Sequence, residues 1–240
     1  MNVLDRLRGG LIVSVQAAPG SALDSPEVIA AMARAAVEGG AAGVRIQGIA
    51  NIAEVRKAVS APIVGLIKRS YEGYEPYITA TMREARELID AEVTIVAFDA
   101  TQRDRPDGST VASITGAIRE AGMLAMADCA LADEGLAAIA AGCDIVATTL
   151  CGYTSATQGT PLPALPLLAQ WKGRGAFVIC EGGVHSPAQA TAAAHAGADA
   201  VVVGTAITNL QWVTNQFASA VRAALPSSRA SESRTKSSHA

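Results

Sequence analysis

The residues best suited to proton-transfer chemistry are a lysine and a glutamate that each end an apolar run. Lys68 ends the run PIVGLIK and Glu181 ends the run AFVICE. A lysine acts as a base only when it is neutral, and partial burial beside a second cation favours the neutral form. Arg69 is predicted to supply part of that neighbouring charge. A protonated glutamate can return a proton or stabilise an oxyanion, so the pair predicts general acid–base catalysis.

Polar residues also end the other apolar runs of the chain. One charged residue after a strand is usually just solvated, and this alternative stays open for each residue taken alone. Polar residues at the ends of many strands together favour one shared active-site opening, since the C-terminal ends of barrel strands form the active-site face. The residues at these ends are Gln16, Arg45, Gln47, Lys68, Arg69, Asp99, Thr101, Asp128, Thr148, Thr149, Glu181, Gly204 and Thr205.

Two glycine-rich turns follow the last two apolar runs. The first is EGGV with Gly182 and Gly183, and the second is VGTAIT with Gly204 and Thr205. Small residues with free backbone N–H groups at these two loops are typical of phosphate binding in barrels. The alternative is a pair of ordinary tight turns. We favour the phosphate site because both turns fall at the expected pair of loops.

The residues above are positioned by predicted strands and helices that alternate along the chain. Eight short apolar runs alternate with alanine-rich segments of helical periodicity, which predicts a single (β/α)8 TIM barrel over residues 1–225. A doubly wound open sheet is the competing fold, but no G-x-G-x-x-G follows the first run. The eight runs are LIVSVQ, GVRIQ, PIVGLIK, VTIVAFD, MLAMAD, DIVATT, AFVICE and DAVVVG.

Composition narrows the range of partners. The net charge is −3 and no basic block accompanies aromatic residues, so a small molecule is expected rather than nucleic acid. Every long apolar stretch is interrupted and no signal peptide is recognisable, so we expect a cytoplasmic protein without membrane association. Four separated cysteines and three histidines lack metal-ligand spacing, so no metal site is expected. Residues 226–240 are polar and serine-rich and are predicted to be a disordered tail.

Four residues outside this set have weaker claims. Alternation predicts that Cys180 points into the barrel wall rather than into the mouth. His185 either touches a ligand or only shapes the start of a helix. Trp171 and Trp212 are expected on the outer shell or at a subunit contact, and a homodimer is the expected assembly.

The motifs together resemble the N-acetylmannosamine-6-phosphate 2-epimerase family. The matching segments, spread over roughly residues 10–210, are GLIVSVQA, GVRIQGI, IVGLIKR, IVAFDATQRDRPDG, LAMADC, ATTLCGYT, CEGG and VVVGTAIT. The resemblance implies a cofactor-independent enzyme that interconverts N-acetylmannosamine 6-phosphate and N-acetylglucosamine 6-phosphate in sialic acid catabolism. It also implies roles for particular residues: Lys68 and Glu181 as the catalytic pair, Gln16, Arg45 and Asp128 as sugar contacts with Tyr153 close by, and the turns of Gly182, Gly183, Gly204 and Thr205 as the phosphate site.

The chain departs from the family pattern at three places. Asn209 stands where many relatives have an arginine, Gly183 where they have a larger residue, and Cys151 where serine is commoner. The first two bear on phosphate binding. Two other functions also fit a lysine at this position, namely a phosphosugar aldolase that forms a Schiff base on Lys68 and a non-catalytic sugar-phosphate sensor.

Overall fold

The computed structural model describes residues 2–224, which form a closed barrel of eight parallel strands. Each strand pairs with the next one, and β8 closes the ring by pairing with β1. The predicted (β/α)8 barrel is therefore confirmed and the open sheet is excluded. The strands are β1 (Leu11–Val15), β2 (Gly43–Gln47), β3 (Ile63–Leu66), β4 (Ile95–Asp99), β5 (Leu124–Asp128), β6 (Ile145–Ala147), β7 (Phe177–Glu181) and β8 (Ala200–Val203).

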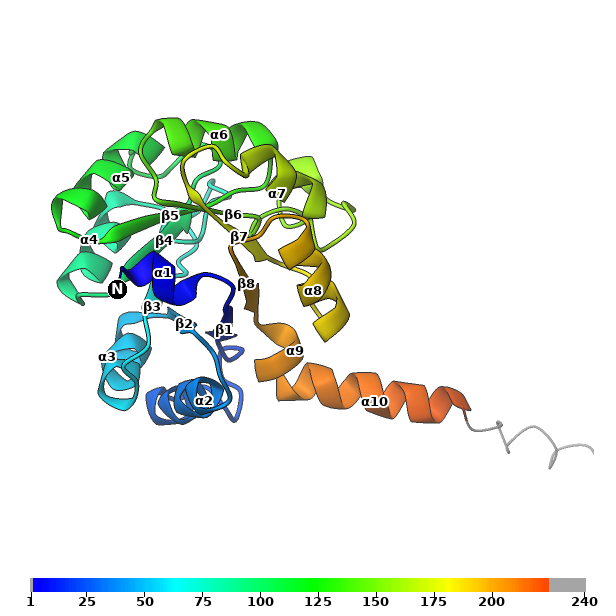
Figure 1. Cartoon of the computed structure of the whole chain (residues 1–240). Helices are drawn as coiled ribbons and strands as arrows, with labels where there is room; N and C mark the ends of the chain where they lie inside the picture. The colour runs from blue at the N-terminus through cyan, green and yellow to red at the C-terminus, as the bar shows by residue number, and fades with distance from the viewer. Residues whose placement is uncertain (1, 225–240) are drawn as a thin grey trace, which may run out of the picture.

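The predicted alternation of strands and helices is also confirmed, because at least one helix follows every strand (Figure 1). Within residues 2–224, no helix is long and apolar enough to cross a membrane. The predicted domain end at residue 225 and the predicted tail at 226–240 lie outside the described residues. The helices are α1 (Val3–Leu7), α2 (Pro26–Glu38), α3 (Ile49–Ala58), α4 (Met82–Asp90), α5 (Val111–Glu120), α6 (Ala132–Ala140), the short 3-10 helix η1 (Ser155–Thr157), α7 (Leu165–Trp171), α8 (Pro187–His195), α9 (Thr205–Thr208) and α10 (Leu210–Ala224).

The strands are apolar on both faces because each face is buried in a different core. Successive side chains of a strand point to opposite sides of the sheet. Val64 and Leu66 of β3 therefore belong to the core inside the barrel, whereas Val96 and Phe98 of β4 belong to the core between the strands and the helices. This double burial explains why the strands read as continuous apolar runs rather than as an alternating pattern.

The short helix α1 closes one end of the barrel. In Figure 1 this helix lies across the end of the barrel that faces the viewer. Its residue Leu7 is fully buried and packs with Ile12 and Phe177 in the interior core. The closed end is the one at which the strands begin, so polar groups at the strand ends lie at the opposite end, where a cavity can open.

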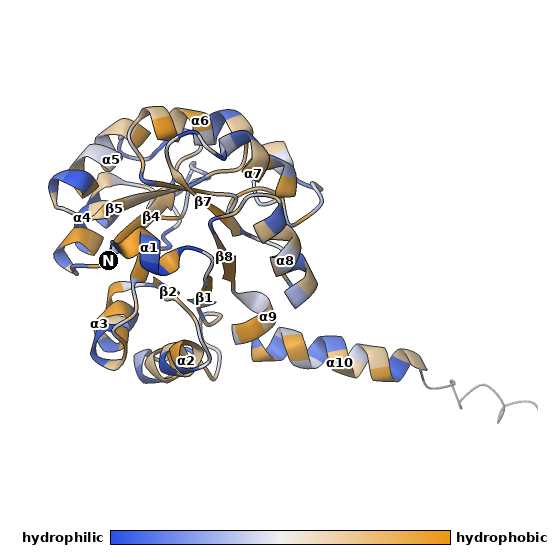
Figure 2. Cartoon of the chain, in the orientation of Figure 1, coloured by the Kyte–Doolittle hydropathy of each residue, from blue (hydrophilic) through white to orange (hydrophobic). Residues whose placement is uncertain are grey.

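The last helix, α10, departs from the ring of outer helices. It points away from the barrel in Figure 1, and none of its described residues is buried. Leu210, Phe217 and Val221 lie along the helix and are 62%, 71% and 61% exposed. Figure 2 shows these apolar positions alternating with polar ones along α10. An apolar stripe of this kind is typical of a helix that packs against another surface.

Candidate active site

The C-terminal end of the barrel contains a cavity of about 390 Å³. The structure brings nine of the ten predicted site residues together around it: Gln16, Arg45, Lys68, Tyr153, Glu181, Gly182, Gly183, Gly204 and Thr205. Asp128 is the exception. It ends β5 directly beneath the cavity, is fully buried and does not itself line the cavity.

Lys68 reaches the cavity through a loop that folds back on β3. This strand ends at Leu66, so the predicted run PIVGLIK is two residues too long at its end. Lys68 instead forms an isolated antiparallel bridge with Ile78, and the N–H of Arg69 donates to the carbonyl of Tyr77 at 2.9 Å. This pairing fixes the Lys68 backbone and carries Tyr77 into the cavity wall.

The environment of Lys68 favours its neutral form. Burial lowers the pKa of the ammonium group, and the positive charge of Arg45 lowers it further. Lys68 is an exposed residue that faces the open cavity, but the cavity wall around it removes part of the water from its side chain. The prediction that Arg69 supplies the neighbouring charge is wrong. Arg69 points away to pair with Glu84 at 2.5 Å and Glu87 at 3.5 Å, because residues next to each other in an extended chain face opposite sides.

Arg45 of β2 links the two sides of the site. Its side chain is almost fully buried and binds both oxygens of Asp128, at 2.6 and 3.2 Å, and Glu181 at 3.1 Å. Burial opposes the charged guanidinium, but the two carboxylates raise the pKa of Arg45 above its usual value. Thr149 donates to Asp128 at 2.7 Å and to Glu181 at 3.2 Å. Arg45 is therefore a fixed positive charge beside Lys68 and Glu181.

Glu181 is held in conditions that favour its protonated form. It is 9% exposed at the end of β7. The pKa of Glu181 is raised from 4.5 to about 7, mainly by burial and in addition by the negative charge of Asp128. Arg45 and Thr149 act in the opposite direction, but they do not cancel the cost of removing a carboxylate from water. Near neutral pH this group can therefore donate a proton as well as accept one.

The two glycine turns form the end of the cavity next to β7 and β8. Gly182 and Gly183 have φ of +98° and +71°, a backbone conformation that side chains rarely adopt. A Cβ at Gly183 would lie 2.2 Å from the Cβ of Leu162. Leu162 thus occupies the space that a larger residue would need, which accounts for the glycine at this departure from the family pattern. Gly204 packs against Ser14 of β1.

The other two departures have structural roles away from the reacting groups. Asn209 lies between α9 and α10, and its side-chain oxygen accepts a hydrogen bond from the N–H of Trp212 at 2.9 Å. It therefore caps α10 while also lining the cavity. Cys151 is buried, and burial raises the pKa of its thiol.

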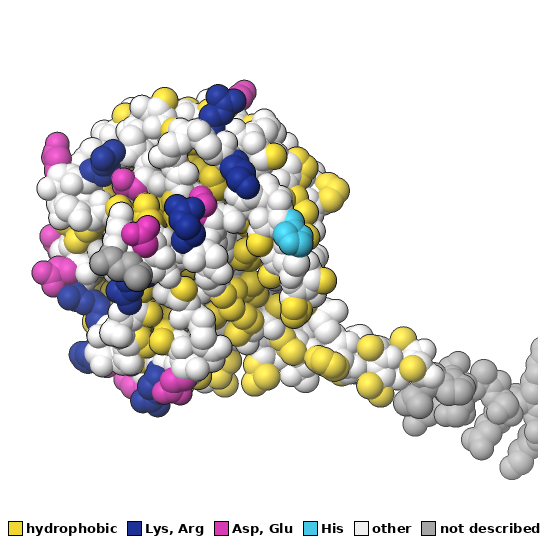
Figure 3. Space-filling model, in the orientation of Figure 1, with side chains coloured by type: hydrophobic (Ala, Val, Ile, Leu, Met, Phe, Trp, Pro, Cys, Tyr) yellow, Lys and Arg dark blue, Asp and Glu magenta, His cyan; other side chains and the backbone are white. Residues whose placement is uncertain are grey.

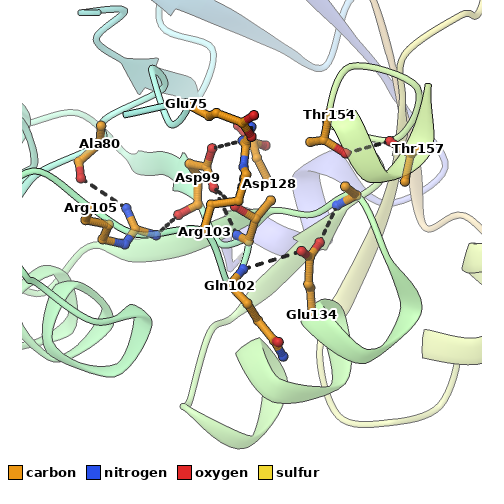
Figure 4. A network of polar contacts seen from close by, with 12 residues as sticks. Glu75, Ala80, Asp99, Gln102, Arg103, Arg105, Asp128, Glu134, Thr154 and Thr157 are labelled. Atoms are coloured by element: carbon orange, nitrogen blue, oxygen red, sulfur yellow. Dashed lines mark hydrogen bonds and ion pairs between the residues drawn. The ribbon is translucent and has the colours of Figure 1, made fainter. Parts of the chain in front are cut away.

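The RDRPDG part of the fourth loop supports the site rather than lining it (Figure 4). Arg103 pairs with Asp99 at 2.6 Å and with Glu75 at 3.3 Å. Arg105 donates to the backbone carbonyls of Ala80, at 3.2 Å, and of Asp99. Asp99 ends β4 as predicted, and Thr101 lies two residues beyond the end of the strand. Neither residue lines the cavity, because their side chains are used within this network.

Several lining residues were not identified from the sequence. Tyr77 depends on the return of the third loop, which no periodicity predicts. Thr149 was noted only as a strand end, although it contacts two acidic groups. Ser14 and Thr208 also line the cavity, and Thr208 donates to the backbone carbonyl of Ser14 at 2.9 Å. Alternation along β1 places Ser14 and Gln16 on the same side, a signal that could have found Ser14.

Cys180 and Trp171 lie as predicted, whereas Trp212 packs against His185 of the cavity lining. Cys180 belongs to the core between strands and helices, and burial raises the pKa of its thiol to about 11. Trp171 is fully buried in the outer shell and donates to the carbonyl of Ala132 at 2.9 Å. Within residues 2–224, no group of three or more His, Cys, Asp or Glu side chains is arranged to hold a metal ion.

The closed barrel, with a lysine and a glutamate of shifted pKa in the cavity at its mouth, defines an enzyme of the (β/α)8 class. Residues 29–223 match the family model described as putative N-acetylmannosamine-6-phosphate epimerase. A putative N-acetylmannosamine-6-phosphate 2-epimerase of Yersinia pestis (strain Pestoides F) is 47% identical over 221 residues, covering 92% of this chain and 94% of the relative. The chain therefore belongs to the N-acetylmannosamine-6-phosphate epimerase family.

Solved structures agree with this assignment. The N-acetylmannosamine-6-phosphate 2-epimerase from Clostridium perfringens superposes with a TM-score of 0.88 at 40% identity, covering 92% of this chain and 96% of that one. A nitroalkane oxidase from Streptomyces ansochromogenes has a TM-score of 0.61 at 22% identity, covering 86% and 68%. The second likeness concerns the barrel fold alone.

Proposed function

We propose that this protein interconverts N-acetylmannosamine 6-phosphate and N-acetylglucosamine 6-phosphate by inverting C2, a step of sialic acid catabolism. One observation carries the proposal. A lysine whose pKa is lowered and a glutamate whose pKa is raised to about 7 lie in one cavity beside the same buried Arg45. An acid–base pair tuned in opposite directions is suited to removing a proton and returning one near neutral pH.

The chemistry follows from the position of the inverted carbon. C2 is next to the C1 carbonyl only in the open-chain aldehyde, and its proton then becomes acidic enough for neutral Lys68 to accept. The electron pair moves onto the C1 oxygen, giving an enolate-like intermediate. Protonated Glu181 returns a proton to the opposite face or stabilises the oxyanion. The fixed charge of Arg45, close to both groups, favours this intermediate. Each residue serves one face of C2, and the two residues exchange the roles of base and acid when the reaction runs in the opposite direction.

The remaining site residues bind the substrate in this proposal. Gln16, Arg45 and Tyr153 contact the sugar, and Asp128 acts from beneath through Arg45 and Thr149 in place of its predicted sugar contact. The backbone N–H groups of Gly182, Gly183, Gly204 and Thr205 bind the 6-phosphate. The left-handed turn at Gly182 and Gly183 supports this assignment, because successive N–H groups in such a turn form a concave anion site.

The direct test is proton NMR of N-acetylmannosamine 6-phosphate incubated with the protein in deuterated water. We expect conversion to N-acetylglucosamine 6-phosphate with deuterium at C2. A phosphosugar aldolase would instead be inactivated when sodium borohydride is added with the sugar, since the borohydride would reduce a Schiff base on Lys68. A sugar-phosphate sensor would bind the sugar without any deuterium entering it. Either of these results would overturn the proposal.

We also propose that the protein is a homodimer joined by exchange of α10. The helix exposes an apolar stripe, and the outward-facing Val201 and Val203 of β8 are each 7% exposed, whereas the outward side chains of β4–β7 are 0 to 1% exposed. Figure 3 shows hydrophobic side chains along α10 and on the adjoining face of the barrel. The helix α10 thus points away from β8 instead of covering it. The apolar stripe of α10 from a second copy fits the face of β8 that is left uncovered.

The connection between α9 and α10 supports exchange of α10 with a second copy rather than packing of α10 onto its own barrel. Asn209 alone separates α9 from α10, and it caps α10 through the N–H of Trp212 at 2.9 Å. No glycine lies between Thr205 and Ala224. With 15 residues, α10 is about 22 Å long and about 10 Å wide. If half of the cylindrical surface of each helix is covered, reciprocal exchange of two such helices would bury about 1,400 Å² in total, counting both partners. This area lies within the roughly 1,200–2,000 Å² of a stable interface.

The proposal places the enzyme in the cytoplasm, acting on a small phosphosugar without nucleic acid, membrane or cofactor. The four cysteines are free and buried in the described chain. Unpaired cysteines suit a reducing compartment. A base whose pKa is lowered by its surroundings can remove a proton next to a carbonyl without a metal ion or an organic cofactor.

A further inference from the structure

The end of the cavity next to β7 and β8 contains no lysine or arginine among its described lining residues. The two cations of the cavity, Arg45 and Lys68, belong to the reacting end, where Arg45 is already bound to two carboxylates. A phosphate monoester carries a charge of about −1.5 to −2 at pH 7. Backbone N–H groups supply partial charges only, so the proposed phosphate end needs another positive group.

His185 is the histidine that lines this end of the cavity. It follows Gly183 by two residues and precedes Ser186, the N-cap of α8. The backbone N–H of His185 donates to the side-chain oxygen of Gln189 at 2.8 Å, which fixes the loop. Within the described chain neither nitrogen of its imidazole ring makes a hydrogen bond, so both can bind a ligand.

An aromatic contact orients the ring of His185. It packs against Trp212 with the ring centroids 4.9 Å apart and an angle of 37° between the planes. Trp212 is itself positioned by Asn209, whose side chain accepts from the Trp212 N–H. A protonated imidazole gains from the electron-rich face of a tryptophan. Among the described residues that line the cavity, Glu181 is the only one with a carboxylate, and it lies at the reacting end.

We propose that His185, held in place by Trp212, is the cationic phosphate ligand of this site and sets its preference for the phosphorylated over the free sugar. The inference rests on the proposed function. A charged hydrogen bond from the imidazolium would complete an anion site whose other donors are the backbone N–H groups of the two glycine turns. It would also explain why the chain manages without an arginine at Asn209.

Calorimetry with inorganic phosphate as the probe, together with steady-state kinetics, tests this inference. His185→Gln keeps one donor but removes the charge, so we expect phosphate binding to weaken by roughly tenfold or more. The KM for the phosphorylated sugar should rise by a similar factor while kcat stays nearly unchanged. His185→Arg should restore both. Trp212→Leu should weaken phosphate binding less, because it removes the orientation and not the charge.

The matched control is His195→Gln, since His195 is exposed at the far end of α8 and does not line the cavity. This variant should bind phosphate as the unchanged protein does. Equal phosphate affinity in His185→Gln and His195→Gln would overturn the inference, as would a failure of His185→Arg to restore binding. If the sugar is not epimerised but phosphate binding still depends on His185, the function is wrong and the anion site stands.

Discussion

Arg45 is the residue that influences both members of the proposed catalytic pair, Lys68 and Glu181. Its charge lowers the pKa of Lys68 and opposes the rise in the pKa of Glu181, while its own charge is secured by Asp128. Lys68 is an exposed residue just after a strand end, but the surrounding cavity wall and the charge of Arg45 both disfavour its own charge. A lysine that only emerged into water would not experience either effect. The arrangement is therefore suited to a base and not to a solvated surface lysine.

The two shifted pKa values predict the pH profile. The working form of the pair holds one proton, with Lys68 neutral and Glu181 protonated, so adding or removing a proton stops turnover. We expect a bell-shaped kcat/KM with one limb near 7, from Glu181, and the other below the usual lysine value of 10.5. Initial rates measured from pH 5 to pH 11 would check this profile. A limb at 4.5, or an alkaline limb at or above 10.5, would contradict it.

At the scale of elements, the loop after β7 depends on a glycine that the family pattern does not require. Gly183→Ala places a side chain in a left-handed conformation and against Leu162. The backbone alone should cost about 1–2 kcal/mol of folding stability, measured by urea unfolding. The contact should also displace the turn and raise the KM for the phosphorylated sugar several-fold.

The control for this prediction is Gly159→Ala in the loop between β6 and α7. Gly159 has a similar φ of +82°, but a Cβ there meets nothing within 4 Å, and Gly159 does not line the cavity. The Gly159→Ala variant should lose folding stability because of its backbone conformation, and its KM should not change. An unchanged KM in Gly183→Ala as well would mean that this turn does not hold substrate.

The sequence predicted most of this element-level picture. Eight runs that are apolar on both faces indicate a barrel, whatever residues its loops contain. The polar residues at the ends of these strands then indicate that they share one active-site opening. What could not be predicted depends on loops and on contacts between strands. The bridge from Lys68 to Ile78 decides that Tyr77 faces the cavity, and the register between β2 and β3 decides that Arg45, rather than Arg69, is the cation that lowers the pKa of Lys68.

At the scale of the whole molecule, α10 is the feature that a single barrel leaves unexplained. Periodicity predicted a helix after β8, but its direction depends on the Asn209 joint and could not be read from the sequence. A helix with an apolar stripe and no buried residue is not stabilised by its own barrel, since most helical stability in proteins comes from tertiary packing. Its order therefore depends on a second copy in our account.

Sedimentation of matched α10 variants tests the exchanged dimer. Phe217→Glu places a charge in the middle of the apolar stripe and should convert the dimer to monomer at micromolar concentration. Asn215→Glu introduces the same charge on the opposite side of α10 and should leave the dimer intact. Equal assembly states in the two variants would rule out α10 as the interface.

The claim that Lys68 and Glu181 move the proton is tested most directly by following C2 exchange and inversion in deuterated water for matched variants. Lys68→Met keeps a side chain of similar length but removes the base, and Lys57→Met makes the same change at an exposed lysine of α3. We predict that Lys68→Met neither exchanges nor inverts, that Glu181→Gln loses inversion at least as strongly as exchange, and that Lys57→Met does both normally. Near-normal inversion in Lys68→Met or in Glu181→Gln would contradict the account.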